Sequence, residues 1–392
     1  MMDISRIYTS PMYVFDVRVL KERIRFLENG FSGMGLCYAI KANTFIISYI
    51  ADNVKRFEVC SPGELDICYN QNIPLSKVVV SGVFKDRKVI ENAIKNYPEI
   101  GFYTVESIGQ LQLLDELSSK YNRNLNVLIR LSSGNQFGVD SNQVYDIIKN
   151  RNCYSNLCFK GLEYYSGTQK TSLKKIEKEL FKIDELISKL SNELGYTVEE
   201  LEYGPGYPVS YFEGEKDFDD AKYLEELKEL LNNMNFKGDI ILELGRAIAA
   251  SCGTYYTKIV DIKETNEQNM AICDGGMNHI VYYGQMMAMK KPFFDIIPSR
   301  HDNFKVWNIF GALCSVNDIM MKQVSLDIKQ GDILAFKNAG AYCMTEGISL
   351  FLSRDLPKIY INDNNKFIVV RDELKTSILN SMMGGVGNGE ID

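Results

Sequence analysis

Lys41 is the side chain whose surroundings in this sequence best suit covalent chemistry. The apolar run Leu36–Ile40 precedes it and Ala42-Asn43 follows it, whereas most lysines of a globular chain lie in polar, solvated surroundings. A lysine amine in apolar surroundings can form a Schiff base with a carbonyl compound. The alternative is a solvated surface lysine, so the other reactive groups must decide between the two.

Histidine chemistry is largely excluded by composition. Only His279 and His301 occur among the 392 residues, so H-E-x-x-H zinc sites and multi-histidine metal cages are impossible, and we predict no metal site. A Ser-His-Asp triad would have to use one of these two, and no G-x-S-x-G elbow is present. The roles of both histidines stay open: His279 follows an Asp-Gly-Gly turn, and His301 lies in a predicted loop.

Two further segments could hold a phosphate and a ring nitrogen. Gly204-Pro205-Gly206 offers backbone N–H groups, and Arg246 offers a guanidinium fork; both suit a phosphate. A lysine near a phosphate site suggests a Schiff base to pyridoxal phosphate, whose chemistry needs a carboxylate at the pyridine nitrogen. Glu243 is the candidate, and its alternative role is a core-edge carboxylate paired with Arg246.

These residues need a scaffold, and the pattern of apolar runs predicts one. Near-continuous apolar runs are typical of parallel strands buried on both faces, and helical patterns separate them, most clearly over Ser172–Leu194. Eight such alternations predict an α/β fold, a (β/α)8 TIM barrel with functional residues after the strand ends. An open doubly wound sheet is the alternative, but no G-x-G-x-x-G opens the first unit. The predicted strands are Leu36–Ile40, Arg56–Cys60, Lys77–Ser81, Glu99–Thr104, Leu125–Leu131, Cys158–Tyr164, Glu199–Tyr203 and Asp239–Glu243.

The pattern of apolar residues changes after Thr254. Short alternating runs without long helices predict a second, mostly antiparallel, β-barrel-like domain, and Lys329–Asp332 (KQGD) is typical of a hairpin turn. Pro11–Asp16 precedes the first barrel strand and is expected to join that second sheet.

The predicted domain boundaries follow from this change. We expect a barrel over residues 28–254 and a β domain made of 1–27 with 255–392.

Composition limits the class of partner. The formal net charge of −7 and a pI near 5.2 disfavour nucleic acid or an anionic membrane as the main partner. No run approaches the ~18 apolar residues of a membrane span, and the first residues lack a signal-peptide pattern. Nine cysteines without a C-x-x-C pair are typical of reduced thiols, so we expect a cytoplasmic protein.

Together these positions resemble the fold-type III pyridoxal-phosphate decarboxylases, the ornithine/diaminopimelate decarboxylase family. The matching motifs run in family order over roughly residues 10–360. They are Tyr38 to Asn43, Phe57 to Ser61 with Gly63 to Leu65, Ser166 to Gln169, Gly204 to Gly206, Glu243-x-Gly-Arg246, Asp274 to Gly276, Gly311 to Asp318 and Gly340 to Tyr342.

The resemblance implies an alanine-racemase-like two-domain architecture and a homodimer in which Cys314 and Asp318 reach the partner's cofactor. It implies that Lys41 and Glu243 act in catalysis and that Cys314 or a neighbouring acid returns a proton to the α-carbon after CO2 leaves. For Cys314 the alternative is a buried core thiol. The implied pyridoxal-phosphate contacts are Lys41, Glu58, Arg130, Tyr165, Gly204, Gly206, Glu243, Gly245, Arg246 and Tyr342. The implied substrate contacts are Asp318, Ser315, Arg354 and Tyr342.

Departures from the family pattern bear on the substrate. Tyr165 stands where many relatives have histidine, Pro205 removes one N–H donor, and Leu244 replaces a common proline. Ser315 stands where enzymes acting on lysine, ornithine or diaminopimelate often carry an acid, although Asp318 could still pair with a distal ammonium.

The region around Tyr165 and the Phe351–Pro357 run resemble the specialised biosynthetic branch, whose members act on modified or carrier-tethered amino acids such as glutamyl-carrier protein. Arg354 could bind a substrate carboxylate or pair with Asp355. The substrate therefore stays open between a free diamino acid and a modified one.

Two other functions remain alternatives. Amino-acid racemases share the lysine-bearing barrel, but they resemble Lys-Ala-Asn-Ala-Tyr-Gly, whereas this chain continues Thr44-Phe45 after Lys41-Ala42-Asn43. The second alternative is a catalytically inactive binding or regulatory protein of the same fold.

Overall fold

The computed structural model describes residues 10–215 and 218–381. The described residues divide into two compact units, one of residues 19–210 and 218–249 and the other of residues 10–18, 211–215 and 250–381. The domain boundaries expected from the sequence stay a prediction. No helix in the described residues is long and apolar enough to cross a membrane.

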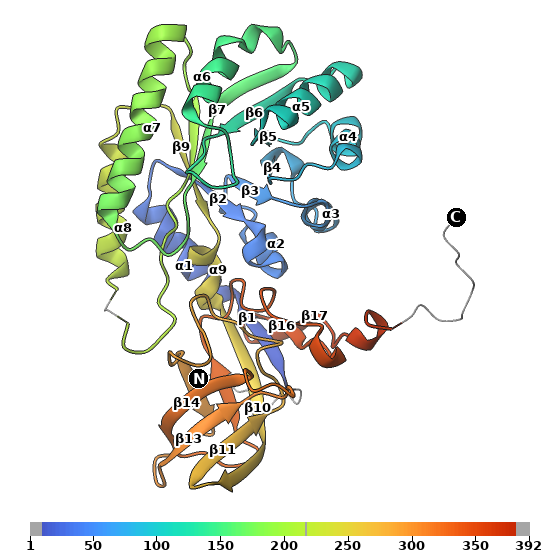
Figure 1. Ribbon diagram of the computed structural model, residues 1–392, viewed down its shortest axis with the longest axis vertical. Helices are drawn as coiled ribbons and strands as arrows, with labels where there is room; N and C mark the ends of the chain where they lie inside the picture. The colour runs from blue at the N-terminus through green and yellow to red at the C-terminus, as the bar shows by residue number, and fades with distance from the viewer. Residues whose placement is uncertain (1–9, 216–217, 382–392) are drawn as a thin grey trace, which may run out of the picture. The chain divides into compact units, whose positions relative to one another are not determined.

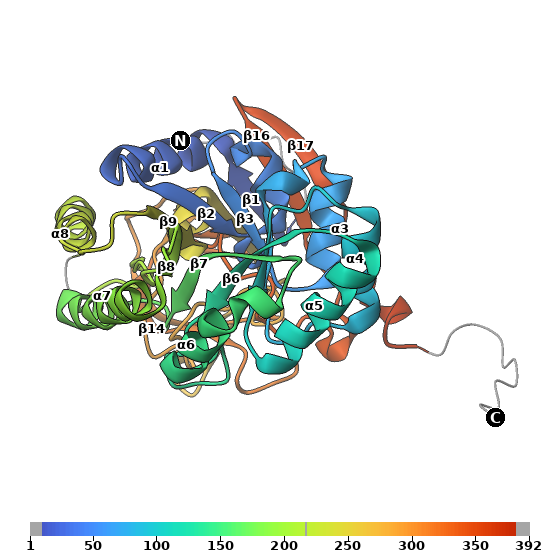
Figure 2. The same cartoon turned by 90° about the horizontal axis from the view of Figure 1, so that it is seen from above.

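The first unit contains a closed barrel of eight parallel strands, which confirms the predicted TIM barrel (Figures 1 and 2). The register between β2 and β9, in which Gly35 faces Ile241, closes the barrel. Each predicted run overlaps one of its strands. The strands are β2 (Gly35–Ala39), β3 (Arg56–Val59), β4 (Val78–Val80), β5 (Phe102–Val105), β6 (Leu125–Arg130), β7 (Leu157–Tyr165), β8 (Glu200–Gly204) and β9 (Asp239–Leu244).

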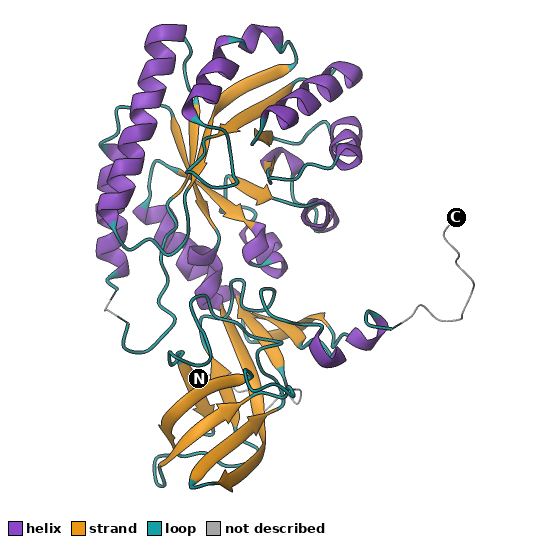
Figure 3. Cartoon of the chain, viewed as in Figure 1, coloured by secondary structure: helices purple, strands orange, loops and turns teal. Residues whose placement is uncertain are grey.

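Helices surround the strands (Figures 2 and 3). The longest, α7 (Leu173–Leu194), buries Ile176, Leu180 and Ile183 at three- and four-residue spacings. Gly195 caps its C-terminus with a φ of +56°, which suits glycine. The others are α1 (Val17–Gly30), α2 (Ile47–Ile50), α3 (Pro62–Asn70), α4 (Arg87–Asn96), α5 (Ile108–Tyr121), α6 (Ser141–Lys149), α8 (Asp220–Asn232) and α9 (Arg246–Ala249).

The second unit is built on a mixed β-sheet. Most of its strand pairs are antiparallel, but β1 pairs with β16 and β11 with β13 in parallel. Met12, Val14, Tyr256 and Ala335 pack together in its core. The strands are β1 (Met12–Asp16), β10 (Gly253–Thr265), β11 (Gln268–Cys273), β12 (Phe294–Ile297), β13 (Lys305–Phe310), β14 (Ile319–Leu326), β15 (Ile333–Phe336), β16 (Lys358–Asp363) and β17 (Lys366–Arg371).

The structure confirms one local prediction for this sheet and corrects another. The Pro11–Asp16 run joins the sheet as β1, between β10 and β16. The hairpin predicted at Lys329–Asp332 is wrong: the turn forms, with Asp332 N–H donating to the Lys329 carbonyl at 3.1 Å, but it joins strands that do not pair. The strand before the turn, β14, pairs with β13, whereas β15 pairs with β10 and β12. A turn sequence alone does not decide which strands pair.

Charged side chains fill part of the barrel interior. The guanidinium of Arg56 donates to Glu200 at 2.6 Å and to Glu202 at 3.2 Å, and it lies 3.7 Å from the centre of the Phe102 ring. Arg56 is 4% exposed and Glu202 is fully buried. Because buried carboxylates need a cation, this arginine holds one side of the barrel together.

We expect Arg56→Met to destabilise the fold by about 3–5 kcal/mol, because two buried carboxylates lose their cation. Urea unfolding of the purified protein measures the loss. Lys55→Met is the matched control: Lys55 pairs with Asp239 at the surface, where an ion pair contributes about 0–1 kcal/mol. Equal midpoints for the two variants would contradict this account.

Candidate active site

Lys41 lies in a short 3-10 turn, Ile40–Ala42, directly after β2. Its Nζ donates to Glu58 Oε2 at 2.7 Å and lies 3.7 Å from Glu243 Oε1. The Cys60 Sγ is 3.6 Å away. The Lys41 side chain is 40% exposed, whereas its two carboxylate partners are buried. The amine is thus held at the mouth of the barrel between two acids, unlike a solvated surface lysine.

Three carboxylates gather beneath this amine. Glu58 on β3, Glu163 on β7 and Glu243 on β9 each place an oxygen within 4.8 Å of the others. Arg130, at the end of β6, is 3.1 Å from Glu163 and 3.5 Å from Glu106. Buried like charges at this separation cannot all ionise freely, so their protonation states differ.

The surrounding charges separate the pKa values of these acids. Burial alone would raise the pKa of Glu58, but the charge and hydrogen bond of Lys41 lower it well below the ordinary range. Burial raises the pKa of Glu243, and the negative charge of Glu58 raises it further. Glu58 is therefore the anion that pairs with Lys41, whereas Glu243 keeps a raised pKa even though the Lys41 amine lies 3.7 Å away.

The loops after β7 and β8 pack closely together. Gly206 has φ of +62°, and a Cβ there would lie 2.1 Å from the Gly167 carbonyl oxygen. A Cβ on Gly204 would lie 2.5 Å from the Tyr165 ring. Only glycine fits at either position, so the backbone stays open to a bound group.

Arg246 completes this part of the site. It begins α9 directly after Gly245, is 6% exposed, and its Nε donates to Thr168 Oγ1 at 3.4 Å. Gly206 lies against Gly167, and Arg246 contacts the next residue, Thr168, so the segments after β7, β8 and β9 meet here. Pro205 leaves the loop after β8 with one N–H fewer.

Tyr165 lies at the end of β7 against Gly204. Burial raises the pKa of its phenol, and Glu243 raises it further. The ring therefore stays neutral near pH 7 and can offer an apolar face but no positive charge.

The residues present fit pyridoxal phosphate. Lys41 offers an amine, Glu243 an acid for a ring nitrogen, and the glycine loops with Arg246 a cradle for a phosphate. The buried Ser81 hydroxyl and Glu163 carboxylate oxygens have no hydrogen-bond partner among the described residues, which also suits a bound polar group. Fold and site together define a barrel enzyme of the kind that uses this cofactor.

Comparison with known proteins gives the family. The sequence model described as "Pyridoxal-dependent decarboxylase, pyridoxal binding domain" matches residues 17–250, more than half of the chain. The chain belongs to the pyridoxal-dependent decarboxylase family, and its cofactor is pyridoxal phosphate.

Several relatives match along most of their length. A diaminopimelate decarboxylase from Vibrio cholerae is 27% identical, over 95% of this chain and 93% of the relative. An L-glutamyl-[BtrI acyl-carrier protein] decarboxylase from Niallia circulans is 24% identical, over 94% and 92%. Among solved structures, a diaminopimelate decarboxylase from M. jannaschii in complex with L-lysine shares the fold, with a TM-score of 0.85, 22% identity and coverage of 97% and 94%.

The second unit carries the remaining predicted residues. Cys314 is exposed, so the alternative of a buried core thiol is wrong. The Arg354 guanidinium donates to the Ala312 carbonyl at 2.9 Å, in the loop that carries Cys314 and Ser315. Tyr342 is half-buried with φ of +65°, an uncommon conformation for a non-glycine residue that marks a constrained turn.

Asp318 has a different environment from the one the sequence suggests. It is 1% exposed, and its two carboxylate oxygens accept the N–H of Met277 at 2.8 Å and of Leu313 at 2.7 Å. It also packs against Gly276 and Gly311, where a Cβ would lie 2.3 Å from it. This arrangement favours a structural role, tying two loops together, over an ion pair with a substrate ammonium.

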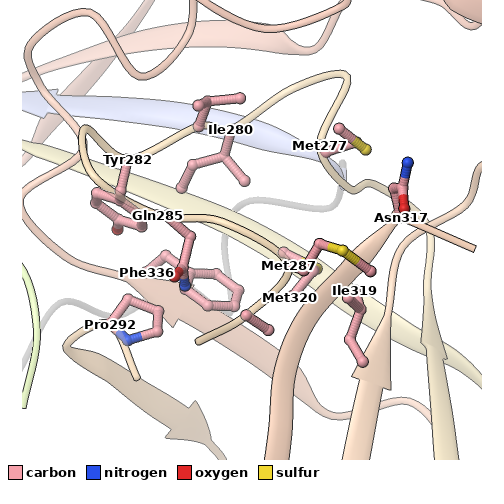
Figure 4. Close-up of a pocket in the computed structure, with 12 residues that line it drawn as sticks. Met277, Ile280, Tyr282, Gln285, Met287, Pro292, Asn317, Ile319, Met320 and Phe336 are labelled. Atoms are coloured by element: carbon pink, nitrogen blue, oxygen red, sulfur yellow. The ribbon is translucent and has the colours of Figure 1, made fainter. Parts of the chain in front are cut away.

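An apolar pocket of about 100 Å³ lies beside these two loops (Figure 4). Met277 and Asn317 line one part of it, and Ile319, Met320 and Phe336 come from strands of the sheet. Asp318, which anchors Met277, therefore helps to shape the pocket.

Sequence reasoning missed several site residues and left one undecided. No role was predicted for Glu163, Glu106 or Cys60. Glu163 lies on β7 two residues before Tyr165, on the same face of the strand, so strand alternation could have found it. His279 is the residue whose role the sequence left open. It is buried, and its ring is hydrogen-bonded to the Asp355 carbonyl at 2.9 Å and to the Tyr255 hydroxyl at 3.1 Å. Burial lowers its pKa to about 4. A neutral structural histidine results.

We expect Glu243→Gln to flatten the pH dependence of stability of the cofactor-free protein. Because the folded-state pKa of Glu243 is raised, its proton stabilises the fold at low pH, and that contribution is lost as the pH rises above the ordinary carboxyl range of about 4–5. The fall in Tm from pH 5 to pH 8 should be smaller in the variant than in the wild type. Glu177→Gln, an exposed change on α7, is the control; an unchanged fall in Glu243→Gln would refute the assignment.

Proposed function

We propose that this chain decarboxylates an amino acid whose far end carries no free ammonium group, such as a glutamyl residue attached to a carrier protein. The reaction class is that of the family. The observation that carries the finer proposal is Asp318: both of its oxygens are occupied by backbone N–H groups, and Ser315 supplies no charge. Because Asp318 is only 1% exposed and Ser315 is uncharged, neither side chain presents an accessible anion to a distal ammonium.

The relative from Niallia circulans supports this choice, since its name describes a glutamyl-carrier substrate. Diaminopimelate is the second candidate, because several relatives of 24–27% identity carry that name.

The barrel residues have distinct proposed roles. When bound, pyridoxal phosphate supplies an electron sink for the electron pair left at the α-carbon as CO2 departs. Lys41 binds the cofactor through its Nζ, and Glu58 orients that amine at 2.7 Å. Glu243 binds the ring nitrogen, keeping it protonated. The Gly204–Gly206 loop and Arg246 hold the phosphate, and Tyr165 offers its face to the ring.

The β-sheet unit supplies the remaining proposed roles. Cys314, whose side chain is exposed, returns a proton to the α-carbon. Arg354 and Tyr342 contact the substrate and cofactor, and the chain acts as a homodimer in which each Cys314 serves the partner's barrel. An exposed thiol in a loop held by Asp318 supports this arrangement.

We expect Lys41→Ala to abolish both the visible absorbance of the bound cofactor and CO2 release, because the amine that holds the cofactor is lost. Absorbance spectra and CO2 assays of the purified variant measure both effects. Lys55→Ala, at an exposed lysine on the other end of the barrel wall, should retain both. A Lys41→Ala protein with full turnover would refute the proposal.

We expect CO2 release from glutamyl-carrier protein to exceed that from free lysine, ornithine and diaminopimelate by at least tenfold in kcat/KM. Mass spectrometry of each product, at equal substrate concentration, measures the ratio. Faster turnover of diaminopimelate would favour the second candidate. Inversion at the α-carbon without CO2 release would identify a racemase instead.

A further inference from the structure

Lys85 is a buried lysine that the proposed reaction leaves without a role. It lies in the loop between β4 and α4 and is 9% exposed, although its neighbour Phe84 is 78% exposed. Its Nζ donates to the Gly82 carbonyl at 3.0 Å and to the Thr104 hydroxyl at 3.2 Å. A buried ammonium is costly unless it is bonded and balanced by negative charge.

The balancing charges lie in the barrel mouth. The charged and titratable groups that act on Lys85 are Glu106 after β5, Glu163 on β7, Arg130 on β6 and Cys60 after β3. Burial lowers the pKa of Lys85 to about 8, against the attraction of Glu106 and then Glu163. The ammonium form therefore still predominates near pH 7.

Glu106 and Glu163 pair with the same cation. A single guanidinium nitrogen, Nη1 of Arg130, pairs with both carboxylates. Their oxygens accept no hydrogen bond from any other described group. Burial raises the pKa of Glu163 and the nearby carboxylate of Glu58 raises it further, against the attraction of Arg130, so Glu163 is the acid whose ionised form gains from another positive charge in this interior.

We propose that Lys85 is a positioning residue: its buried ammonium shares with Arg130 the charge of Glu106 and Glu163, and so sets the electrostatic potential at Lys41. The inference rests on the proposed attachment of the cofactor to Lys41. Lys85 acts through the carboxylate network. A fixed positive charge in this interior disfavours protonation of nearby groups. It therefore lowers the pKa of the nitrogen through which Lys41 would hold the cofactor.

The test is a pH titration of the visible absorbance of the cofactor-loaded protein. Lys85→Met removes the charge and keeps most of the volume, so the midpoint of the titration should move upward by about one pH unit. Lys85→Arg keeps the charge and should restore the wild-type midpoint. Lys88→Met, an exposed change on α4, is the matched control and should leave the midpoint unchanged.

A second variant keeps the test decisive where Lys85→Met does not fold. Thr104→Val removes one hydrogen bond to the ammonium at nearly constant shape, so it should move the midpoint in the same direction by a smaller amount. If Lys85→Met folds and keeps the wild-type midpoint, the proposal is overturned. If Lys85→Met does not fold, a Thr104→Val protein with the wild-type midpoint overturns it instead.

The titration separates the role of Lys85 from the identity of the substrate. The titration needs only bound cofactor, so a wrong substrate assignment leaves it intact. A wild-type protein with no visible absorbance would overturn the role of Lys41 and this proposal together. Wild-type absorbance with an unmoved Lys85→Met midpoint would overturn the role of Lys85 alone.

Discussion

The ion pair between Lys41 and Glu58 is the interaction on which the site depends. It places a cation over a cluster of buried acids that would otherwise repel one another. Because Glu58 takes the positive charge, Glu243 is left as the acid with the raised pKa. One contact at 2.7 Å thus gives two glutamates different roles: Glu58 binds the amine as an anion, and Glu243 is the acid with the raised pKa.

The barrel makes this division possible. Parallel strands bring residues that are far apart in sequence to one end of the barrel, where Glu58, Glu163 and Glu243 meet. The glycines of the loops after β7 and β8 keep the neighbouring backbone open, since side chains there would collide with Gly167 or Tyr165. In the β-sheet unit, Asp318 accepts a backbone N–H on each of its two carboxylate oxygens and so fixes the loop that presents Cys314.

Much of this arrangement could be predicted from sequence because the signals are local. Buried parallel strands appear as apolar runs, and the residues after Leu36–Ile40 and Asp239–Glu243 carry the reactive groups. What could not be predicted depends on long-range pairing. The turn at Lys329–Asp332 has hairpin chemistry, yet the strands beside it find other partners. Asp318 suggests a substrate ligand by type and motif, but only three-dimensional structure shows that backbone N–H groups occupy it.

The most direct test of the central claim is where the cofactor is attached. Borohydride reduction of the cofactor-loaded protein, followed by proteolysis and mass spectrometry, fixes a phosphopyridoxyl group to the lysine that carries it. The account predicts one modified peptide, containing Lys41. A modification at Lys85 or any other lysine instead, or an unmodified protein that still releases CO2, would contradict it.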